Sequence, residues 1–523
     1  MKKKTFNKSY LLNEFATYKK MAEDFSKLGQ LEKSLKSCFF AARIAYHYPI
    51  LYNFVDEHLE NTLQNISCKI LKDQNTNSKP NYHKKIVFYD TQIIDSSQLT
   101  EHFLDYFIKN NFEVLFIVSE RNKTIYGTKI LKKINASNQI SLFIPSDNNF
   151  SNRIIETYKE ILIFKPSHAF IQMKPDDIMG FSVFANLKNI KTYYLDITGH
   201  TFWIGKTIFN YFIEIFQSYW LTSIKRRGID ISKLIYLHIY PIIDKNVFEG
   251  FPFDRKNKII GLSGGQIYKY LADPELNYFK VIARLLKENE NFIFCLAGGG
   301  MPTIKIEKFI LENELQTKFY LLGKRSDFYE LVGKSDIFFE SYPIKGGLTP
   351  LFSIENKKPI VGMVGQNSFS LGLEHILDLD TFNQVESLDE FYEEATLLIR
   401  SSAERKKNVS RFDNCKKTKY YFELGLDDIM LNKKYQENPI INYELKFDDE
   451  NSLEEYVNID NAEFNYYLEK LYFTWSCLNW YSRISTFGYL ILTIRKKSTF
   501  NLILEYCKYY INVISNKKTN KSF

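Results

Sequence analysis

Short apolar runs of strand length alternate with helical stretches twice along the chain, and this pattern limits the fold more than any other feature. The first set of runs is Lys85–Tyr89, Phe112–Ser119, Gln139–Ile144, Ala169–Gln172, Thr192–Leu195 and Tyr219–Ser223. The second set is Lys258–Leu262, Phe292–Ala297, Phe319–Leu322, Ile337–Glu340 and Ile360–Met363. Such alternation is typical of parallel sheets covered by helices on both faces. The sequence therefore predicts an α/β fold with two tandem doubly wound, Rossmann-like domains, and a cleft between the carboxyl ends of their strands.

The length of 523 residues is too great for a single hydrophobic core. We predict a helical N-terminal extension over 1–75, a first Rossmann-like domain over 85–245, a second over 250–425, and a helical C-terminal region over 452–515. Asp73–Lys84 is polar, contains Pro80 and is typical of a linker.

Both helical extensions allow two interpretations. Gly29, Ala41 and Pro49 vaguely resemble one tetratricopeptide unit, but arrays of that kind need about three units to be stable, so a helical cap on the next domain is favoured. The C-terminal region is rich in aromatic residues, which suits a peripheral membrane contact, an acceptor surface, or a helical return that packs on the first sheet domain. The return is favoured, because the basic residues do not line one face.

The composition limits the classes of binding partner and the cellular compartment that suit this chain. A net charge of +8 suits an anionic substrate or a membrane surface, and no Lys/Arg block is long enough to indicate binding to nucleic acid. The six cysteines include no C-x-x-C pair, which indicates neither a zinc site nor a disulfide framework. The N-terminus lacks the apolar core of a signal peptide, and no run of 18 apolar residues is present. We therefore expect a cytoplasmic protein; the sequence does not indicate its oligomeric state.

The stretch Asp336–Met363 predicts a strand, a glycine turn, a short helix and a second strand. Gly346 and Gly347 form the turn, Thr349 and Pro350 begin the helix, and Glu355 lies one to two turns along it. Backbone N–H groups at such a helix start attract phosphate, and Glu355 is within reach of a ribose. The alternative is an ordinary crossover whose glycines only tighten the turn.

Three more strand ends in the second domain carry glycines or cations. Gly264 and Gly265 follow the first strand, with Lys269 shortly after them as a mobile cation for a diphosphate. Gly298–Gly300 follow the next strand, and Arg325 lies just past the third. Taken singly, the glycines are equally well explained as strand–helix turns, and Lys269 as a surface lysine.

In the first domain, His200 follows the strand Thr192–Leu195 and has Gly199 beside it. A single histidine is more often structural. At the carboxyl end of a strand that faces a cleft, it is also a candidate general base or phosphate donor.

The order and spacing of these segments over about 190–380 resemble the GT-B nucleotide-sugar glycosyltransferases, in particular the group of the O-linked N-acetylglucosamine transferases and the bacterial cytoplasmic N-glycosyltransferases. The resemblance implies transfer of a hexose or N-acetylhexosamine from a UDP-sugar to a protein or glycan acceptor. It also implies that Gly199-His200 faces the cleft, that Lys269 contacts the diphosphate, that Gly346–Thr349 cradles the phosphates and that Glu355 holds the ribose. Val364–Ser368 is similar to the loop that follows the next strand in that group.

Two departures affect the chemistry. The family's run of threonines is reduced to Thr349 followed by Pro350, which removes one N–H donor. Gly347 stands where retaining families place a second glutamate, which favours an inverting reaction. Asp378-Leu379-Asp380 has the D-x-D form of metal-dependent transferases, but it lies downstream of the other motifs, so we interpret it, like Asp176-Asp177, as a loop. We expect no metal site and no cofactor besides the donor.

Two other hypotheses stay open. A UDP-sugar epimerase of the same architecture needs extra carboxylates in the cleft, for which Asp196 and Glu340 are the available candidates. A catalytically silent partner subunit would bind nucleotide, peptide or glycan without turnover, and the reduced threonine motif is compatible with this role. An epimerised nucleotide sugar formed without acceptor would indicate the first, and glycan or peptide binding without UDP binding would indicate the second.

Overall fold

The computed structural model describes the chain from residue 8 to residue 431. Within that span it leaves out 48–50, 52–53, 75–83, 92, 94–97, 120–127, 200, 272, 274, 301–302 and 364–384. The chain divides into two compact units, 1–456 and 457–523. The second unit lies outside the described residues, and so does the C-terminal helical region predicted over 452–515.

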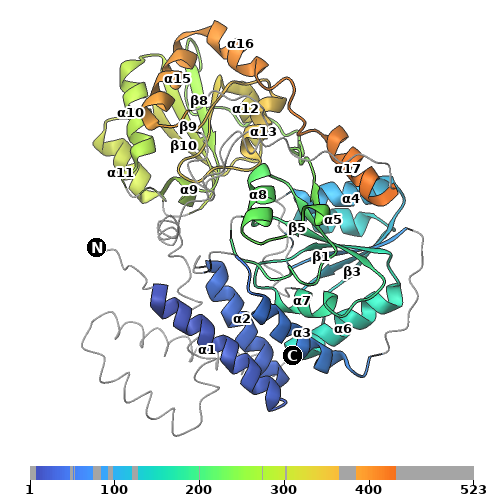
Figure 1. Cartoon of the computed structure of the whole chain (residues 1–523). Coiled ribbons are helices and arrows are strands. Elements are labelled where there is room, and N and C mark those ends of the chain that lie inside the picture. Colours follow the sequence, from blue (N-terminus) through green and yellow to red (C-terminus); the bar gives the residue numbers. More distant parts are fainter. Residues whose placement is uncertain are drawn as a thin grey trace, which may run out of the picture. The chain divides into compact units, whose positions relative to one another are not determined.

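The first sheet consists of seven parallel strands in the order β3-β2-β1-β4-β5-β6-β7 (Figure 1). Its strands are β1 (Lys85–Asp90), β2 (Glu113–Val118), β3 (Ile140–Phe143), β4 (His168–Gln172), β5 (Lys191–Asp196), β6 (Tyr211–Glu214) and β7 (Leu234–Tyr236). The strand order reverses direction between β1 and β4, which is the switch point of a doubly wound sheet. Ligands of such sheets bind beyond the carboxyl ends of the strands at this point.

Helices cover both faces of the first sheet, so its strands are apolar on both sides. These helices are α4 (Leu99–Lys109), α5 (Thr128–Ala136), α6 (Phe150–Phe164), α7 (Ile178–Phe184) and α8 (Gln217–Lys225). On β1, Phe88 packs against Phe103 of α4 and Phe116 of β2. The next side chain, Tyr89, points to the other face and meets Phe184 of α7 edge-on. This period of two is the strand alternation that buries successive residues on opposite faces.

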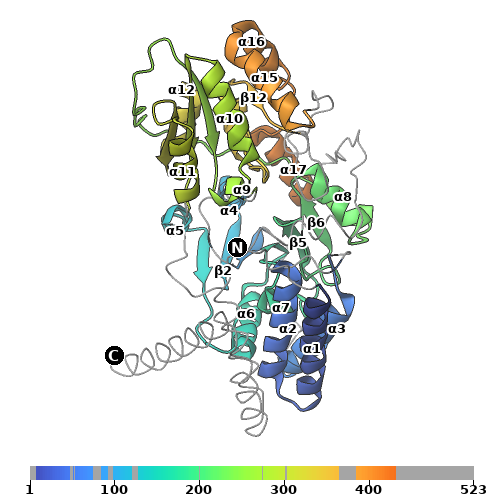
Figure 2. The ribbon, with the colours of Figure 1, turned by 90° about the vertical axis from the view of Figure 1, so that its left-hand side faces the viewer.

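Three N-terminal helices pack side by side and against the first sheet's helices (Figures 1 and 2). They are α1 (Lys8–Lys27), α2 (Leu31–His47) and α3 (Glu57–Leu71). Glu60 of α3 is fully buried and accepts hydrogen bonds from the backbone N–H groups of Gly205, Lys206 and Thr207, at 2.9, 3.2 and 2.8 Å. Because these donors belong to the loop before β6, the helices form a cap on the first sheet domain, as the favoured interpretation of the sequence expects.

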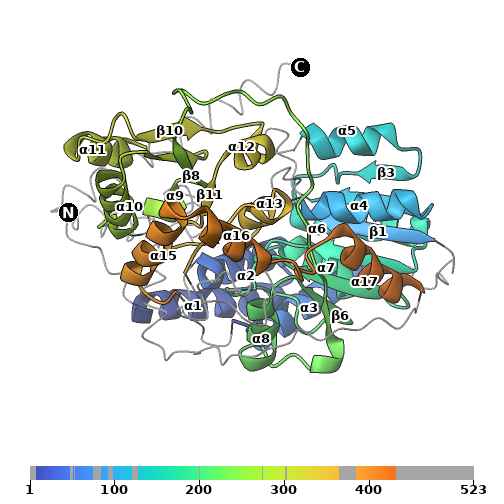
Figure 3. The ribbon, with the colours of Figure 1, turned by 90° about the horizontal axis from the view of Figure 1, so that it is seen from above.

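The second sheet consists of five parallel strands in the order β10-β9-β8-β11-β12. Its strands are β8 (Ile259–Gly264), β9 (Phe292–Ala297), β10 (Phe319–Gly323), β11 (Ile337–Phe339) and β12 (Ile360–Val361). Its helices are α9 (Tyr268–Leu271), α10 (Asn277–Glu288), α11 (Ile304–Glu312), α12 (Phe328–Lys334), α13 (Thr349–Glu355), α15 (Leu388–Arg400) and α16 (Ser402–Ser410). Figure 3 shows α10 and α15 on one side of this sheet and α12 and α13 on the other. The predicted fold of two tandem Rossmann-like sheets is confirmed.

One predicted strand is wrong. The run Tyr219–Ser223 belongs to helix α8, in which every residue from Gln217 to Ser223 is buried. Because α8 is buried all round over these residues, the five-residue run shows no helical period that would distinguish it from a strand. The strands β6 and β7, which flank this helix in the chain, are only four and three residues long and were not predicted.

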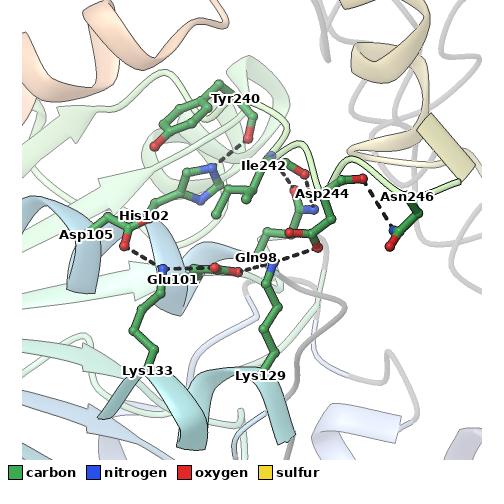
Figure 4. Close-up of polar contacts among 10 residues, drawn as sticks. All are labelled: Gln98, Glu101, His102, Asp105, Lys129, Lys133, Tyr240, Ile242, Asp244 and Asn246. Atoms are coloured by element: carbon green, nitrogen blue, oxygen red, sulfur yellow. Dashed lines mark hydrogen bonds and ion pairs between the residues drawn. The ribbon is translucent and has the colours of Figure 1, made fainter. Parts of the chain in front are cut away.

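The segment that connects the two sheets is attached to the first sheet's helices at its start (Figure 4). Gln98 donates to the carbonyl of Ile242 at 3.0 Å and accepts from the N–H of the same residue at 2.9 Å. His102 Nε2 donates to the carbonyl of Tyr240 at 2.6 Å. Burial lowers the pKa of His102 to about 3, so its ring is neutral at neutral pH.

Further along, the same segment contacts elements of both sheets. Lys129 bridges Glu101 of α4 and Asp244 of the connecting segment, at 2.9 and 2.7 Å (Figure 4). Two residues later, the N–H of Asn246 donates to Glu330 of α12 at 2.8 Å. The polypeptide therefore passes from one sheet domain to the other within Asp244–Asn246.

The chain returns to the first sheet through α17 (Lys419–Leu431). Tyr106 of α4 donates to Asp427 of this helix at 2.7 Å, and Lys109 pairs with Glu423 at 2.7 Å. The range 425–451 looks irregular in the sequence, yet its described part, 425–431, is helical. The tertiary contacts with α4 supply the stability that its sequence pattern does not indicate.

Candidate functional site

The glycine turns of the second sheet approach one another at the carboxyl ends of β8 and β9. Gly264 ends β8 and Gly265 follows it, and Gly298 directly follows β9. A Cβ on Gly298 would lie 1.9 Å from the carbonyl oxygen of Gly265, and a Cβ on Gly264 would lie 2.4 Å from the ring of Phe328. These glycines are required because backbone and ring occupy the space that any side chain would need.

Lys269 lies on α9, directly after this turn, and is partly buried. Its ammonium donates to the carbonyl of Lys345 at 2.8 Å. Burial lowers the pKa of Lys269, and the nearby carboxylate of Glu340 opposes that shift. The structure therefore brings Lys269 to the turn that carries Gly346, and its contact with the diphosphate stays a prediction.

The turn itself is organised around Glu340, which follows β11. The N–H of Gly346 donates to Glu340 Oε1 at 2.7 Å. A Cβ on Gly346 would lie 2.1 Å from the hydroxyl of Thr349, so only glycine fits there. The hydroxyl of Thr349 is buried and has no hydrogen-bond partner among the described residues. A hydroxyl and an ammonium thus lie at one glycine turn, and the hydroxyl has no partner among the described residues that a ligand would have to displace.

The other glycine of the turn meets the first sheet. A Cβ on Gly347 would lie 3.1 Å from the ring of Phe216, which directly precedes α8. Beside it, Lys417 donates to the carbonyl of Ile215 at 2.9 Å and to the hydroxyl of Tyr236 at 3.1 Å. The turn therefore has the carboxyl end of β6 as its neighbour.

Glu355, predicted to hold the ribose, occupies the last position of α13, about 9 Å along the helix from Thr349 at 1.5 Å per residue. It borders a hollow of about 210 Å³, together with Lys358, Phe412 and Lys417. Partial burial raises the pKa of Glu355. Lys269 does not line this hollow, so no contact of Glu355 connects it with the turn at Lys269. The proposed role of Glu355 in holding the ribose stays a prediction.

Arg325, predicted to bind the donor, is engaged in local contacts. Its Nε and one terminal nitrogen donate to the two carboxylate oxygens of Asp327 at 2.7 and 2.6 Å. The other terminal nitrogen donates to the carbonyl of Gly250 at 3.0 Å, and Nε lies 3.3 Å from a carboxylate oxygen of Glu249. Arg325 therefore links the connecting segment to the end of β10. Because these bonds occupy its guanidinium group, they do not favour the predicted contact with the donor, which stays a prediction.

His200 lies outside the described residues, but both its neighbours are held in place. Arg227 is fully buried, and one of its terminal nitrogens donates to the carbonyls of Gly199 and Thr201, at 2.8 and 2.7 Å. Its other terminal nitrogen lies 3.4 Å from Asp196 Oδ2. Trp203 donates to the same carboxylate oxygen at 3.1 Å.

Beside this ion pair lies a second buried carboxyl group, Glu214. Burial, reinforced by the charge of Asp196, raises the pKa of Glu214 well above its ordinary value. Burial also raises the pKa of Asp196, but Arg227 opposes that shift. We infer that at neutral pH Asp196 is ionised and pairs with Arg227, while Glu214 keeps its proton and accepts a hydrogen bond from Ser223 at 2.6 Å.

The sequence interpretation considered Glu340 and Asp196 only as carboxylates for an epimerase, and it missed Glu214 and Arg227. The sequence does contain a signal that could have identified the carboxylates. Asp196 and Glu214 end β5 and β6, and Glu340 follows β11 directly. A carboxylate that ends an apolar strand of a parallel sheet lies at the edge where such sheets bind ligands.

The acidic pairs considered for a metal receive no support. Asp177 accepts a hydrogen bond from the hydroxyl of Tyr89 at 2.7 Å and caps α7, and Asp176 beside it is also buried. Asp378 and Asp380 lie outside the described residues. In the part of the chain that the structure describes, no group of three or more His, Cys, Asp or Glu side chains is placed to hold a metal ion. None of the helices in that part is both long and apolar enough to cross a membrane.

No protein-family model and no curated protein matches this chain by sequence. Among solved structures, a glycosyltransferase from Rickettsia africae is similar over 68% of this chain and 100% of its own, with 14% identity and a TM-score of 0.52. A mutant O-GlcNAc transferase from Thermobaculum terrenum covers 79% of this chain and 83% of its own, with 12% identity and a TM-score of 0.46.

A third similar structure is the HepE protein of Anabaena in complex with UDP and glucose, which covers 67% of this chain and 99% of its own, with 13% identity and a TM-score of 0.48. At these identities the similarity concerns the fold alone. The assignment of the fold rests on the Rickettsia structure, whose TM-score of 0.52 is the highest of the three. Together with the two parallel sheets, this similarity shows that the chain has the GT-B fold of tandem Rossmann-like domains.

Proposed function

We propose that this protein is a glycosyltransferase that takes a hexose or N-acetylhexosamine from a UDP-sugar, and that Lys269 and the turn Gly346–Thr349 hold the donor diphosphate. The observation that carries the proposal is the placement of the Lys269 ammonium on the carbonyl of Lys345, next to a buried Thr349 hydroxyl that has no partner in the described part of the chain. The solved structure with the same fold is named as a glycosyltransferase, which supports the reaction class.

The reaction needs positive charge where the diphosphate leaves. The bond between the anomeric carbon and the diphosphate oxygen breaks, and the acceptor forms the new bond to that carbon while it loses a proton. Two ammonium groups, of Lys269 and Lys345, lie at the turn, and hydrogen bonds from charged donors are the strong ones. Preorganised donors of this kind stabilise charge that develops in the transition state.

The finer features of the reaction are part of the proposal. Gly347 stands where retaining enzymes carry a second glutamate, which supports inversion, and the lysines supply charge without a metal ion. The acceptor would be a protein or glycan, and His200, whose chain neighbours Gly199 and Thr201 are bound by Arg227, is the proposed group for its deprotonation.

A thermal-shift series with UDP, GDP and UDP-sugars tests the proposal. We expect UDP and UDP-sugars to raise the melting temperature by several degrees, because a ligand at a hundredfold excess over its Kd stabilises the folded state by about 2.7 kcal/mol. GDP is the matched control and should shift it less.

The turnover products separate the remaining hypotheses. NMR of a UDP-sugar incubated with the protein should show slow hydrolysis to UDP and free sugar. Formation of an epimerised UDP-sugar would assign the protein to the epimerases instead. If no nucleotide shifts the melting temperature, the proposal is wrong.

A further inference from the structure

Glu340 is the most deeply buried ionisable group of the donor turn, with 1% of its surface exposed. Its Oε1 accepts hydrogen bonds from the N–H of Ser341 at 3.0 Å and from the N–H of Gly346 at 2.7 Å. The hydroxyl of Ser341 lies 3.2 Å from the same oxygen and donates to the carbonyl of Ile344 at 2.8 Å. The backbone from Ser341 to Gly346 therefore wraps around this one oxygen. Since a buried donor without an acceptor is costly, the position of the turn depends on Glu340.

The second oxygen of this carboxylate is different. Glu340 Oε2 is buried and has no hydrogen-bond partner among the described residues. Lys269 donates to the carbonyl, and Glu340 accepts from the N–H, of the one peptide group that joins Lys345 to Gly346. Burial raises the pKa of Glu340, and the N–H of Gly346 and the charges of Lys345 and Lys269 oppose that shift. Among the described residues, Glu340 is the charged group that opposes the lowering of the Lys269 pKa. The unpartnered oxygen thus belongs to a carboxyl group that lies in a site with two cations.

Among the described residues, the ionisable groups near Glu340 other than its two lysines are tyrosines that stay neutral. Tyr270 shares a hydrogen bond of 2.7 Å with Ser263, and Tyr278 donates to the same hydroxyl at 3.5 Å. Burial raises the pKa of both phenols, and the charge of Glu340 raises it further. In the described part of the chain, Glu340 is therefore the one anion available to balance Lys269.

We propose that Glu340 is a positioning residue of the donor site, which fixes the turn through Gly346 and serves as the counter-ion that keeps Lys269 charged until the diphosphate binds. This inference rests on the proposed function. Glu340 thus has two roles. Its Oε1 holds the turn in place, and the negative charge of the carboxylate keeps Lys269 protonated.

The two tasks affect nucleotide binding with opposite signs. Burial lowers the pKa of Lys269 and the carboxylate raises it, so without the carboxylate Lys269 loses its proton at a lower pH. Conversely, the carboxylate repels an incoming diphosphate, and without it an already charged Lys269 binds the anion more tightly. The substitution Glu340→Gln separates these effects, since its amide oxygen still accepts from Gly346 N while the charge is gone.

The test measures the Kd of UDP by calorimetry from pH 6 to pH 9.5 for the wild-type chain and for Glu340→Gln. The ratio of the two Kd values at each pH removes the titration of UDP itself. We expect Glu340→Gln to bind UDP about fivefold more tightly at pH 6 and about tenfold more weakly at pH 9.5, so that the two curves cross. Lys345 also lies beside Glu340, and the next pair of variants separates its effect from that of Lys269.

A second pair of variants identifies Lys269 as the titrating group. In a Lys269→Met background, Glu340→Gln should tighten UDP binding by the same factor at every pH, because the amine that the carboxylate is proposed to keep charged is absent. A purely structural Glu340 would instead give weaker binding at all pH values alike, with or without Lys269, and this result would overturn the inference. A wild-type protein that binds no UDP at any pH would overturn the proposed function and this inference together, whereas UDP binding with a ratio that does not change with pH would overturn the inference alone.

Discussion

Replacing Lys269 with alanine is expected to weaken UDP binding by about 10- to 150-fold, because a hydrogen bond between charged partners contributes about 1.5–3 kcal/mol. Its ammonium is oriented by the carbonyl of Lys345 and lies where the diphosphate would bind. The loss of transfer rate should be larger, about 10²- to 10³-fold in kcat, since the charge on the diphosphate is greatest as the sugar departs. Calorimetry with UDP and a coupled assay for UDP release measure the two effects.

A lysine on the neighbouring helix supplies the control. Lys280 of α10 is exposed and pairs with Glu275 at 3.8 Å on the surface. Lys280→Ala removes the same charge from the same domain and should leave both UDP affinity and kcat within twofold. Equal losses in the two variants would mean that net charge, rather than the position of Lys269, attracts the nucleotide. Full activity of Lys269→Ala with an unchanged melting temperature would refute the assigned site.

Replacing Arg227 with methionine is expected to destabilise the protein by about 4 kcal/mol, because it leaves the fully buried carboxylate of Asp196 without its cation. It also removes the donor for the carbonyls of Gly199 and Thr201, and the cation that lies 4.6 Å from the ring centroid of Trp203. Urea denaturation monitored by tryptophan fluorescence measures the change.

Two further variants show whether the ion pair causes this loss. Lys225→Met alters an exposed lysine at the end of α8, two residues away, and should change stability by less than about 0.5 kcal/mol. Combining Arg227→Met with Asp196→Asn should cost less than the sum of the single changes, since removal of both charges leaves no unpaired ion. Strict additivity, or a cost below about 1 kcal/mol for Arg227→Met, would contradict the buried pair.

Most of the fold could be predicted because parallel strands covered on both faces are apolar along their whole length. The run Phe292–Ala297 coincides with β9, and the run Thr192–Leu195 lies within β5. The prediction failed where burial does not distinguish a helix from a strand, or where a strand is very short. Helix α8 is buried around its whole circumference, and β7 has only three residues, too few for a periodic pattern.

The local part of the site could be predicted as well. The turn Gly346–Gly347 and the start of α13 at Thr349 are encoded within a few residues, so their turn chemistry is visible in the sequence. Arg325 shows the opposite outcome. Its partner Asp327 is only two residues away, and the spacing Arg-x-Asp could have indicated a local ion pair instead of a ligand contact.

The partnerships that organise the site could not be predicted, because they join residues far apart in the chain. Lys269 meets Lys345 across 76 positions, and Arg227 meets Thr201 across 26. Which strand-end carboxylate receives a cation depends on the loops that pack over it. Asp196 and Glu340 look alike in the sequence, and only the folded chain gives one of them an arginine and the other two lysines.

A crystal structure of the chain grown with UDP tests the central claim most directly. It should show the diphosphate within hydrogen-bonding distance of the Lys269 ammonium and the Thr349 hydroxyl, with Gly346 still bonded to Glu340. UDP found in the hollow bordered by Glu355 and Lys417, with Lys269 still directed only to the carbonyl of Lys345, would show that the donor site has been assigned to the wrong turn.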